Sequence, residues 1–166
     1  MGERGAALVT GGARRIGRAL VAAAADAGYD VAIHVRAVDD EAEAAAAEVR
    51  AKGRKAAILA CDLRKEATTV ALVGEAEAEL GPVTLLVNSA SVFEEDAFTD
   101  MNRASWDAHM ETNLRAPFLL SQACSAYPTT ADTVRSISLP RLSETRLCRP
   151  WSSSFSASPS DAPCWW

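Results

Sequence analysis

The sequence contains no long hydrophobic run. Nowhere in its 166 residues is there a stretch of about 18 uncharged apolar residues, the length that a membrane-spanning helix needs. The first residues, Met1-Gly2-Glu3-Arg4, lead directly into a short apolar segment and show neither the apolar region nor the cleavage site of a signal peptide. We therefore expect a cytoplasmic protein with no membrane partner.

Positive charge is also scarce. The chain has 17 Lys and Arg against 22 Asp and Glu, a formal net charge of -5, and only Arg14, Arg15 and Arg18 form a basic cluster. Because a nucleic-acid surface must be neutralised by clustered cations, this balance argues against a nucleic-acid partner.

The four cysteines lack the spacing of a metal site. Cys61, Cys124, Cys148 and Cys164 form no C-x-x-C pair and have no histidine at ligand spacing. We expect reduced thiols and no bound metal.

The chain changes character near Cys124. All nine glycines and all three lysines precede this residue, whereas residues 125–166 hold ten serines, five of the seven prolines and three of the four tryptophans. At this length one domain is expected. We assign residues 1–124 to a folded cofactor-binding part, and residues 125–166 to an irregular or disordered tail that is not native to the fold.

Strand and helix signals alternate regularly in the first part. Short apolar runs predict strands at 6–9, 31–35, 56–61 and 83–87, and helical periodicity predicts helices at 16–27, 39–52, 66–80 and 104–124. Strands that are apolar throughout belong to a parallel sheet covered on both faces. The expected fold is therefore α/β, a Rossmann-type doubly wound parallel sheet that is incomplete, with about four strands.

A glycine-rich loop joins the first strand to the first helix. In Thr10-Gly11-Gly12-Ala13-Arg14-Arg15-Ile16-Gly17 the glycines allow a tight turn and a close backbone approach, and the helix N-terminus offers N–H groups to a pyrophosphate. A P-loop is excluded because Arg18-Ala19 stands where Lys-Ser/Thr is required. A glycine turn without a ligand is the alternative.

The second strand ends in a cation. NAD-specific folds place an acid here to hold the ribose 2′-hydroxyl, but this chain has His34-Val35-Arg36. Arg36, with Arg15 or Arg14, favours a 2′-phosphate and hence NADP(H). His34 is either a sheet residue or a ligand contact.

Four motifs in register resemble the short-chain dehydrogenase/reductase family, and their variants resemble its pteridine-reductase-like branch. They are Thr10-Gly11-x-x-x-Arg15-Ile16-Gly17, Cys61-Asp62-Leu63, Asn88-Ser89-Ala90-Ser91 and Thr112-Asn113-Leu114. In the first, Arg15 replaces the usual middle glycine. A methyltransferase on a similar sheet is an alternative that the third and fourth motifs argue against.

The resemblance implies roles for individual residues. Asp62, followed by Leu63, would contact the adenine, and Asn88, Ser89 and Ala90 would line the cofactor. Asp62 could also cap the next helix.

Two further positions leave alternatives open. The resemblance makes Asn113 the asparagine of the proton relay, although it could instead be a polar helix residue satisfied by backbone. Phe93 either packs within its loop or borders a substrate.

The catalytic pair of that family is missing. Its members need a Ser and a Tyr-x-x-x-Lys, in which the tyrosine transfers a proton to or from the substrate. Here the tyrosines are Tyr29 and Tyr127, the latter followed four residues later by Ala131, and the last lysine is Lys65. The missing pair and the composition of residues 125–166 predict a frameshift near codon 124, which would leave the fourth strand as an unpaired edge.

Two functions remain open. By resemblance the lineage is an NADP(H)-dependent oxidoreductase that transfers a hydride to a pterin or another carbonyl compound, whose full-length members assemble as homotetramers. For this chain, without its catalytic pair, the alternative is an inactive nucleotide-binding remnant or regulatory fragment.

Overall fold

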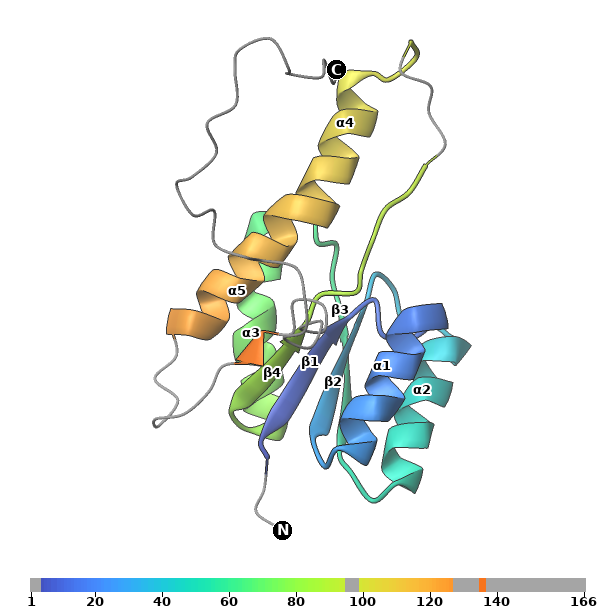
Figure 1. Cartoon of the computed structure of the whole chain (residues 1–166), viewed down its shortest axis with the longest axis vertical. Helices are drawn as coiled ribbons and strands as arrows, with labels where there is room; N and C mark the ends of the chain where they lie inside the picture. The colour runs from blue at the N-terminus through green and yellow to red at the C-terminus, as the bar shows by residue number, and fades with distance from the viewer. Residues whose placement is uncertain (1–3, 95–98, 127–134, 137–166) are drawn as a thin grey trace, which may run out of the picture.

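The apolar segments of the sequence form the parallel strands of one sheet. The computed structural model describes residues 4–94, 99–126 and 135–136 (Figure 1). The strands are β1 (Ala6–Thr10), β2 (Asp30–Val35), β3 (Ala56–Ala60), β4 (Val83–Val87) and β5 (Arg135–Ser136), in the spatial order β3-β2-β1-β4-β5. The predicted fold class is confirmed.

Helices cover both faces of the sheet. They are α1 (Arg15–Asp26), α2 (Asp40–Ala51), α3 (Glu66–Leu80), α4 (Arg103–Met110) and α5 (Ala116–Ala126), with a π-helical turn η1 (Glu111–Arg115) joining the last two. On the central strand β1, Ala7 and Val9 pack in the core formed with α1 and α2, whereas Leu8 packs in the opposite core with α3 and α5. Figure 1 shows these two helix pairs on opposite sides of the sheet. This is doubly wound packing, in which every residue of β1 is buried.

The ends of the helices follow local sequence signals. The Asp39 side chain accepts a hydrogen bond from the Ala42 backbone N–H at 2.9 Å and so caps α2, as expected for an acid that begins a helix. Helix α3 has the predicted bounds and ends at Gly81, whose φ of 87° is a conformation that side chains disfavour.

The last helix has a feature that was not predicted. The expected helix at 104–124 is present over 103–126, but residues Glu111–Arg115 form a π-helical turn within it. Hydrophobic periodicity does not distinguish one extra residue in a helical turn from regular helix.

One expectation about the tail is wrong in a detail. We expected the fourth strand to be an unpaired edge, but Leu85 and Leu86 of β4 pair in parallel with Arg135–Ser136, which forms β5. The predicted disorder of the tail falls on residues 127–134 and 137–166, which lie outside the described residues.

Among the helices that the structure describes, none has the length and apolar character required to span a membrane.

Candidate cofactor site

The carboxyl ends of four strands meet at one edge of the sheet. Thr10 pairs with His34, Val9 with Val87 and Val35 with Ala60, so the residues that follow these strands lie at the same level. The chain reverses its direction of winding at β1, because β2 lies on one side of it and β4 on the other. Ligands of open α/β sheets bind in the crevice at such a point. A cavity of about 510 Å³ lies there.

Two glycines of the phosphate loop are required by close packing. Gly11 has a φ of 64°, and a Cβ atom on it would lie 2.9 Å from Ala90 Cα. A Cβ atom on Gly17 would overlap the carbonyl oxygen of Gly11. The loop therefore folds tightly against both the start of α1 and the loop after β4.

The start of α1 opens into the cavity. Arg14 occupies the N-cap position but makes no side-chain capping bond, and the first backbone bond of the helix runs from Arg18 N–H to the Arg14 carbonyl. The N–H groups before it have no acceptor within the helix and can bind an anion. Arg15 has a φ of 49°, the left-handed conformation that suits the glycine usual at this place in the family.

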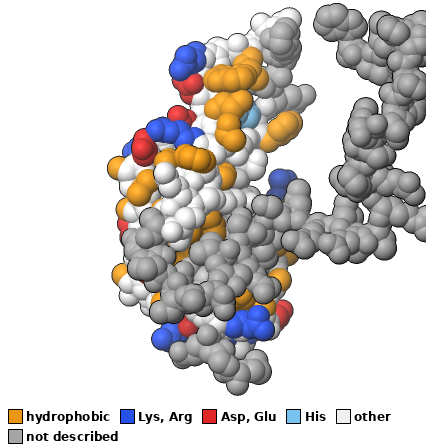
Figure 2. All heavy atoms as spheres, turned by 60° about the vertical axis from the view of Figure 1, so that its left-hand side comes forward, with side chains coloured by type: hydrophobic (Ala, Val, Ile, Leu, Met, Phe, Trp, Pro, Cys, Tyr) orange, Lys and Arg blue, Asp and Glu red, His pale blue; other side chains and the backbone are white. Residues whose placement is uncertain are grey.

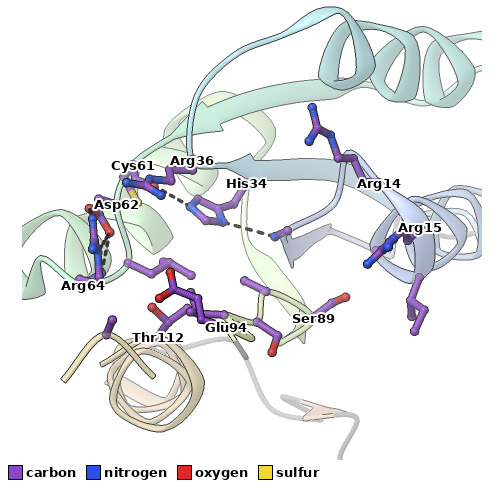
Figure 3. A pocket seen from close by; sticks show the side chains of 18 residues that line it. Arg14, Arg15, His34, Arg36, Cys61, Asp62, Arg64, Ser89, Glu94 and Thr112 are labelled. Carbon is purple, nitrogen blue, oxygen red and sulfur yellow. Dashed lines mark hydrogen bonds and ion pairs between the residues drawn. The ribbon is translucent and has the colours of Figure 1, made fainter. Parts of the chain in front are cut away.

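His34 connects two strand ends below the cavity. Its Nδ1 accepts the Gly11 N–H at 3.4 Å, and its Nε2 lies 3.1 Å from the Cys61 carbonyl oxygen, to which it donates (Figure 3). Burial lowers the pKa of His34, while the bond to Cys61 raises it less. His34 is 3% exposed and belongs to β2, as expected for a sheet residue, and it also lines the cavity, where a contact with a ligand stays a prediction.

Thr10 holds the loop after β4 against β1. Its hydroxyl accepts the backbone N–H groups of Ser89 at 3.0 Å and Ala90 at 3.1 Å, and lies 3.4 Å from the Val87 carbonyl oxygen. Thr10 is buried and lies outside the cavity lining. It shapes the site from beneath.

The arginines of the cavity differ in their partners. Arg14 is bound by Asp39 at 2.8 Å and by Glu41. Arg15 and Arg36 are exposed and form no hydrogen bond or ion pair with any part of the chain that the structure describes. These two cations are free to bind an incoming anion.

The loop after β3 carries a locked ion pair. Arg64 Nε lies 2.9 Å from Asp62 Oδ1 and Arg64 Nη2 lies 2.6 Å from Asp62 Oδ2, and the Arg64 backbone N–H also donates to Oδ1. The hydrogen bonds from Arg64 hold the pKa of Asp62 far below its usual range, with a smaller contribution from the charge of Arg36. The expected helix cap is wrong, because Lys65 is the N-cap of α3.

Helix α4 and η1 fix the loop after β4. The Asn113 side chain accepts the Val92 N–H and donates to the Val92 carbonyl oxygen, both at 2.8 Å. One turn earlier, His109 Nε2 accepts the Glu94 N–H at 3.2 Å. Asn113 is thus satisfied by backbone, which was one of its two expected environments. Phe93, between the two attachment points, is 87% exposed, so the expectation that it packs within the loop is wrong.

The cavity brings together most of the predicted cofactor residues. Those that line it are Gly11, Arg14, Arg15, Ile16, Gly17, His34, Arg36, Asp62, Leu63, Ser89 and Ala90. Thr10, Asn88 and Asn113 are not part of the lining, and Asn88 is exposed. The cofactor contacts of all these residues remain predictions.

Seven further residues line the cavity: Cys61, Arg64, Ser91, Val92, Glu94, Ala108 and Thr112. Three of them, Cys61, Ser91 and Thr112, belong to the four sequence motifs, which could have indicated them. Arg64 and Glu94 carried no sequence signal beyond their nearness to Asp62 and Ser91.

Comparison with known proteins identifies the family. The family model described as short chain dehydrogenase matches residues 5–133. The chain belongs to the short-chain dehydrogenase family. The matched segment continues past residue 124, where we expected the native fold to end.

Relatives in this family are similar over about half of their own length. The chain is 35% identical over 124 residues to the short-chain dehydrogenase/reductase eriH of Hericium erinaceus, covering 72% of this chain and 48% of that protein. It is 33% identical over 112 residues to the 3-oxoacyl-[acyl-carrier-protein] reductase FabG of Staphylococcus epidermidis, covering 68% and 46%. The chain spans about half the length of these short-chain dehydrogenases.

Solved structures of the family share the fold. The FolM alternative dihydrofolate reductase 1 from Brucella canis, complexed with NADP, is 39% identical with a TM-score of 0.72, covering 79% of this chain and 53% of that one. A blue fluorescent protein from a metagenomic library, in complex with NADPH, is 35% identical with a TM-score of 0.71, covering 75% and 51%.

Proposed function

We propose that this chain binds NADP(H) in the cavity at the carboxyl edge of its sheet. The observation that carries the proposal is that two free arginines, Arg15 and Arg36, line the same cavity as the open N-terminus of α1. The helix start suits the pyrophosphate, and the arginines suit the additional 2′-phosphate. A cavity of about 510 Å³ is also large enough for much of a dinucleotide.

Known complexes support this cofactor. Two similar family members, FolM from Brucella canis and the metagenomic blue fluorescent protein, are in complex with NADP and NADPH respectively. When bound, the nicotinamide supplies or accepts a hydride. We assign pyrophosphate binding to the backbone of Gly11 to Gly17, 2′-phosphate binding to Arg36 with Arg15 or Arg14, and the adenine end to Asp62 and Leu63.

We further propose that the 166-residue chain holds the cofactor without turning it over by the family route. The Tyr-x-x-x-Lys pair is absent from its sequence. The remaining member of the relay, Asn113, has both side-chain atoms engaged by Val92. We still assign the lineage of this chain to the oxidoreductases. The 39% identity to the FolM reductase supports a pterin-like substrate for full-length proteins of this lineage.

The binding proposal is tested by titrating the purified chain with NADPH and following the nicotinamide fluorescence. NADPH is expected to bind, and NADH to bind more weakly by about tenfold or more, since one charge-assisted contact is worth about 1.5–3 kcal/mol. Arg36→Ala is expected to lower NADPH affinity and leave NADH affinity unchanged. Arg103→Ala, on an exposed side chain of α4, is the matched control. Absence of NADPH binding would refute the proposal.

The turnover proposal is tested by NADPH oxidation with a panel of pterins and quinones. We expect the rate to equal that of the buffer blank. Oxidation above the blank that disappears in Gly17→Ala would overturn the inactive assignment and leave the oxidoreductase assignment in place.

The change in composition near Cys124 supports a frameshift as the origin of the tail. Sequencing of the gene through codons 115 to 166 tests this proposal. We expect that inserting or deleting one base near codon 124 restores a Tyr-x-x-x-Lys in the translated sequence. If no one-base change restores this motif, the frameshift proposal is wrong.

We also propose that the chain associates with itself through its last helix, as the family resemblance implies. Trp106, Met110, Leu114 and Phe118 recur every four residues along α4, η1 and α5 and are 37–66% exposed. Figure 2 shows hydrophobic side chains gathered along this part of the surface. Light scattering after gel filtration is expected to give an oligomer for the wild type and a smaller species for Leu114→Lys.

A further inference from the structure

Arg64 differs from Arg15 and Arg36, two other arginines of the cavity, in having its donor edge occupied. Its Nε and Nη2 atoms both donate to the Asp62 carboxylate, at 2.9 and 2.6 Å from Oδ1 and Oδ2. A forked pair of this kind holds the guanidinium and the carboxylate close to one plane. The pair therefore fixes the orientation of the guanidinium, while the side chain remains 41% exposed.

The surroundings of Arg64 make it a poor phosphate ligand. Its charge is offset by Asp62, and both this carboxylate and that of Glu94 raise the pKa of Arg64. Arg15 and Arg36, by contrast, have no carboxylate bound to them in the described parts of the chain. A dinucleotide phosphate would be drawn to those two arginines.

The position of Arg64 suits a flat, uncharged group. Figure 3 shows Asp62 and Arg64 at one end of the cavity and Arg15 at the other, with Glu94 facing the cavity from the loop after β4. With its Nε edge turned to Asp62, the guanidinium has its planar face and its Nη1 group left for a ligand. Guanidinium planes stack on aromatic rings, and the proposed function assigns the adenine, an aromatic ring, to the Asp62 end of the cavity.

We infer that Arg64 contacts the cofactor, its guanidinium forming one face of the adenine subsite in an orientation fixed by Asp62. This inference rests on the proposed binding of NADP(H). The arginines of the cavity then have separate roles, because Arg15 and Arg36 recognise phosphate whereas Arg64 recognises the base.

The test compares NADPH dissociation constants, measured by nicotinamide fluorescence, for the wild type, Arg64→Leu and Arg64→Lys. We expect Arg64→Leu to weaken binding about tenfold, a typical effect of losing a cation–π contact. Arg64→Lys should lose most of the same factor, since lysine keeps the charge but has no planar group. Reduced nicotinamide mononucleotide, which lacks the adenosine, should bind all three proteins equally.

A second pair of variants separates direct contact from an effect through Asp62. Arg64→Leu is introduced into an Asp62→Asn background, where no carboxylate requires orientation. We expect the loss of NADPH affinity to persist there. A loss that vanishes in this background would show that Arg64 acts only on Asp62 and would overturn the inference.

The remaining outcomes are also decisive. NADPH binding by Arg64→Leu within twofold of the wild type overturns this inference but leaves the proposed function intact, whereas a wild type that does not bind NADPH refutes the proposed function itself. Equal urea midpoints by circular dichroism confirm that the variants fold. A variant that fails to fold is replaced by Arg64→Gln, which keeps a planar group without the charge and for which we expect partial retention of affinity.

Discussion

Acidification is expected to destabilise this protein through His34. The ring is 3% exposed, and each of its nitrogens faces a backbone group: Nδ1 accepts the Gly11 N–H, and Nε2 donates to the Cys61 carbonyl. Protonation of Nδ1 would place two N–H groups against each other in a buried site. Burial accordingly lowers the pKa of His34 in the folded chain, whereas in the unfolded chain the pKa is about 6.5.

The sign and size of the effect follow from proton linkage. Between the lowered folded pKa and about pH 6.5, the unfolded state binds more protons than the folded state, so stability falls as the pH falls. The contribution of neutral His34 is present in full above about pH 6.5 and is lost below it. From about pH 7.5 to about pH 5.5 the unfolded pKa alone sets an upper limit of about 1.4 kcal/mol on this loss.

The assay is urea unfolding at these two pH values, followed by far-UV circular dichroism. His34→Gln is the matched control, because an amide can accept and donate in the same place but does not titrate. The carboxyl of Asp62, whose folded pKa is also lowered, titrates below this window. The wild type should lose more stability than His34→Gln on acidification, by at most about 1.4 kcal/mol. Equal losses in the two proteins would refute the reasoning.

Three further predictions follow from single contacts. Gly17→Ala should abolish NADPH binding and lower the urea midpoint, because the new Cβ overlaps the Gly11 carbonyl oxygen; wild-type affinity would contradict the tight loop. Asp39→Asn should retain the cap of α2 but remove one of the two carboxylates that bind Arg14, leaving Glu41, and so tighten NADPH binding, whereas Asp39→Ala should also cost about 1 kcal/mol of stability in urea titrations. Burial raises the pKa of the Cys124 thiol to about 11, so the folded chain should not react with iodoacetamide at this residue at about pH 8. Peptide mapping should find Cys124 alkylated only after urea is added. Rapid labelling of the folded chain would show that α5 does not pack as described.

The fold could be predicted from the sequence because its signals are local and mutually consistent. The predicted helix at 66–80 is observed with those bounds, and the predicted strand at 83–87 is β4. These signals act over a few residues only. They are the apolar runs of the strands, the N-capping acid Asp39 and the helix-ending glycine at position 81. Strand order and register could not be predicted in this way, because helices can cover both faces of a parallel sheet for more than one order of its strands.

The site could be predicted only where a motif specifies the backbone. The phosphate loop lines the cavity as expected, because Gly11 and Gly17 are needed for its packing. Which arginine is free could not be predicted: Arg14 and Arg15 are neighbours in sequence, but Arg14 alone reaches Asp39, 25 residues away. The hydrogen bond from the Glu94 N–H to His109 could not be predicted either, because it joins a helix to a loop and hydrophobic periodicity does not indicate such contacts.

The π-turn Glu111–Arg115 sets the rotational phase between the two halves of the last helix. A π-turn accommodates one residue more than regular α-helix, so removing one residue there would give a more regular helix but rotate α4 by about 100° relative to α5. His109 lies before this turn and Asn113 within it, and both hold the loop on which the cavity rests. The π-turn thus fixes the rotation of α4 relative to α5. As a result, α5 packs on α3 while His109 and Asn113 still bind the loop after β4 at the cofactor site.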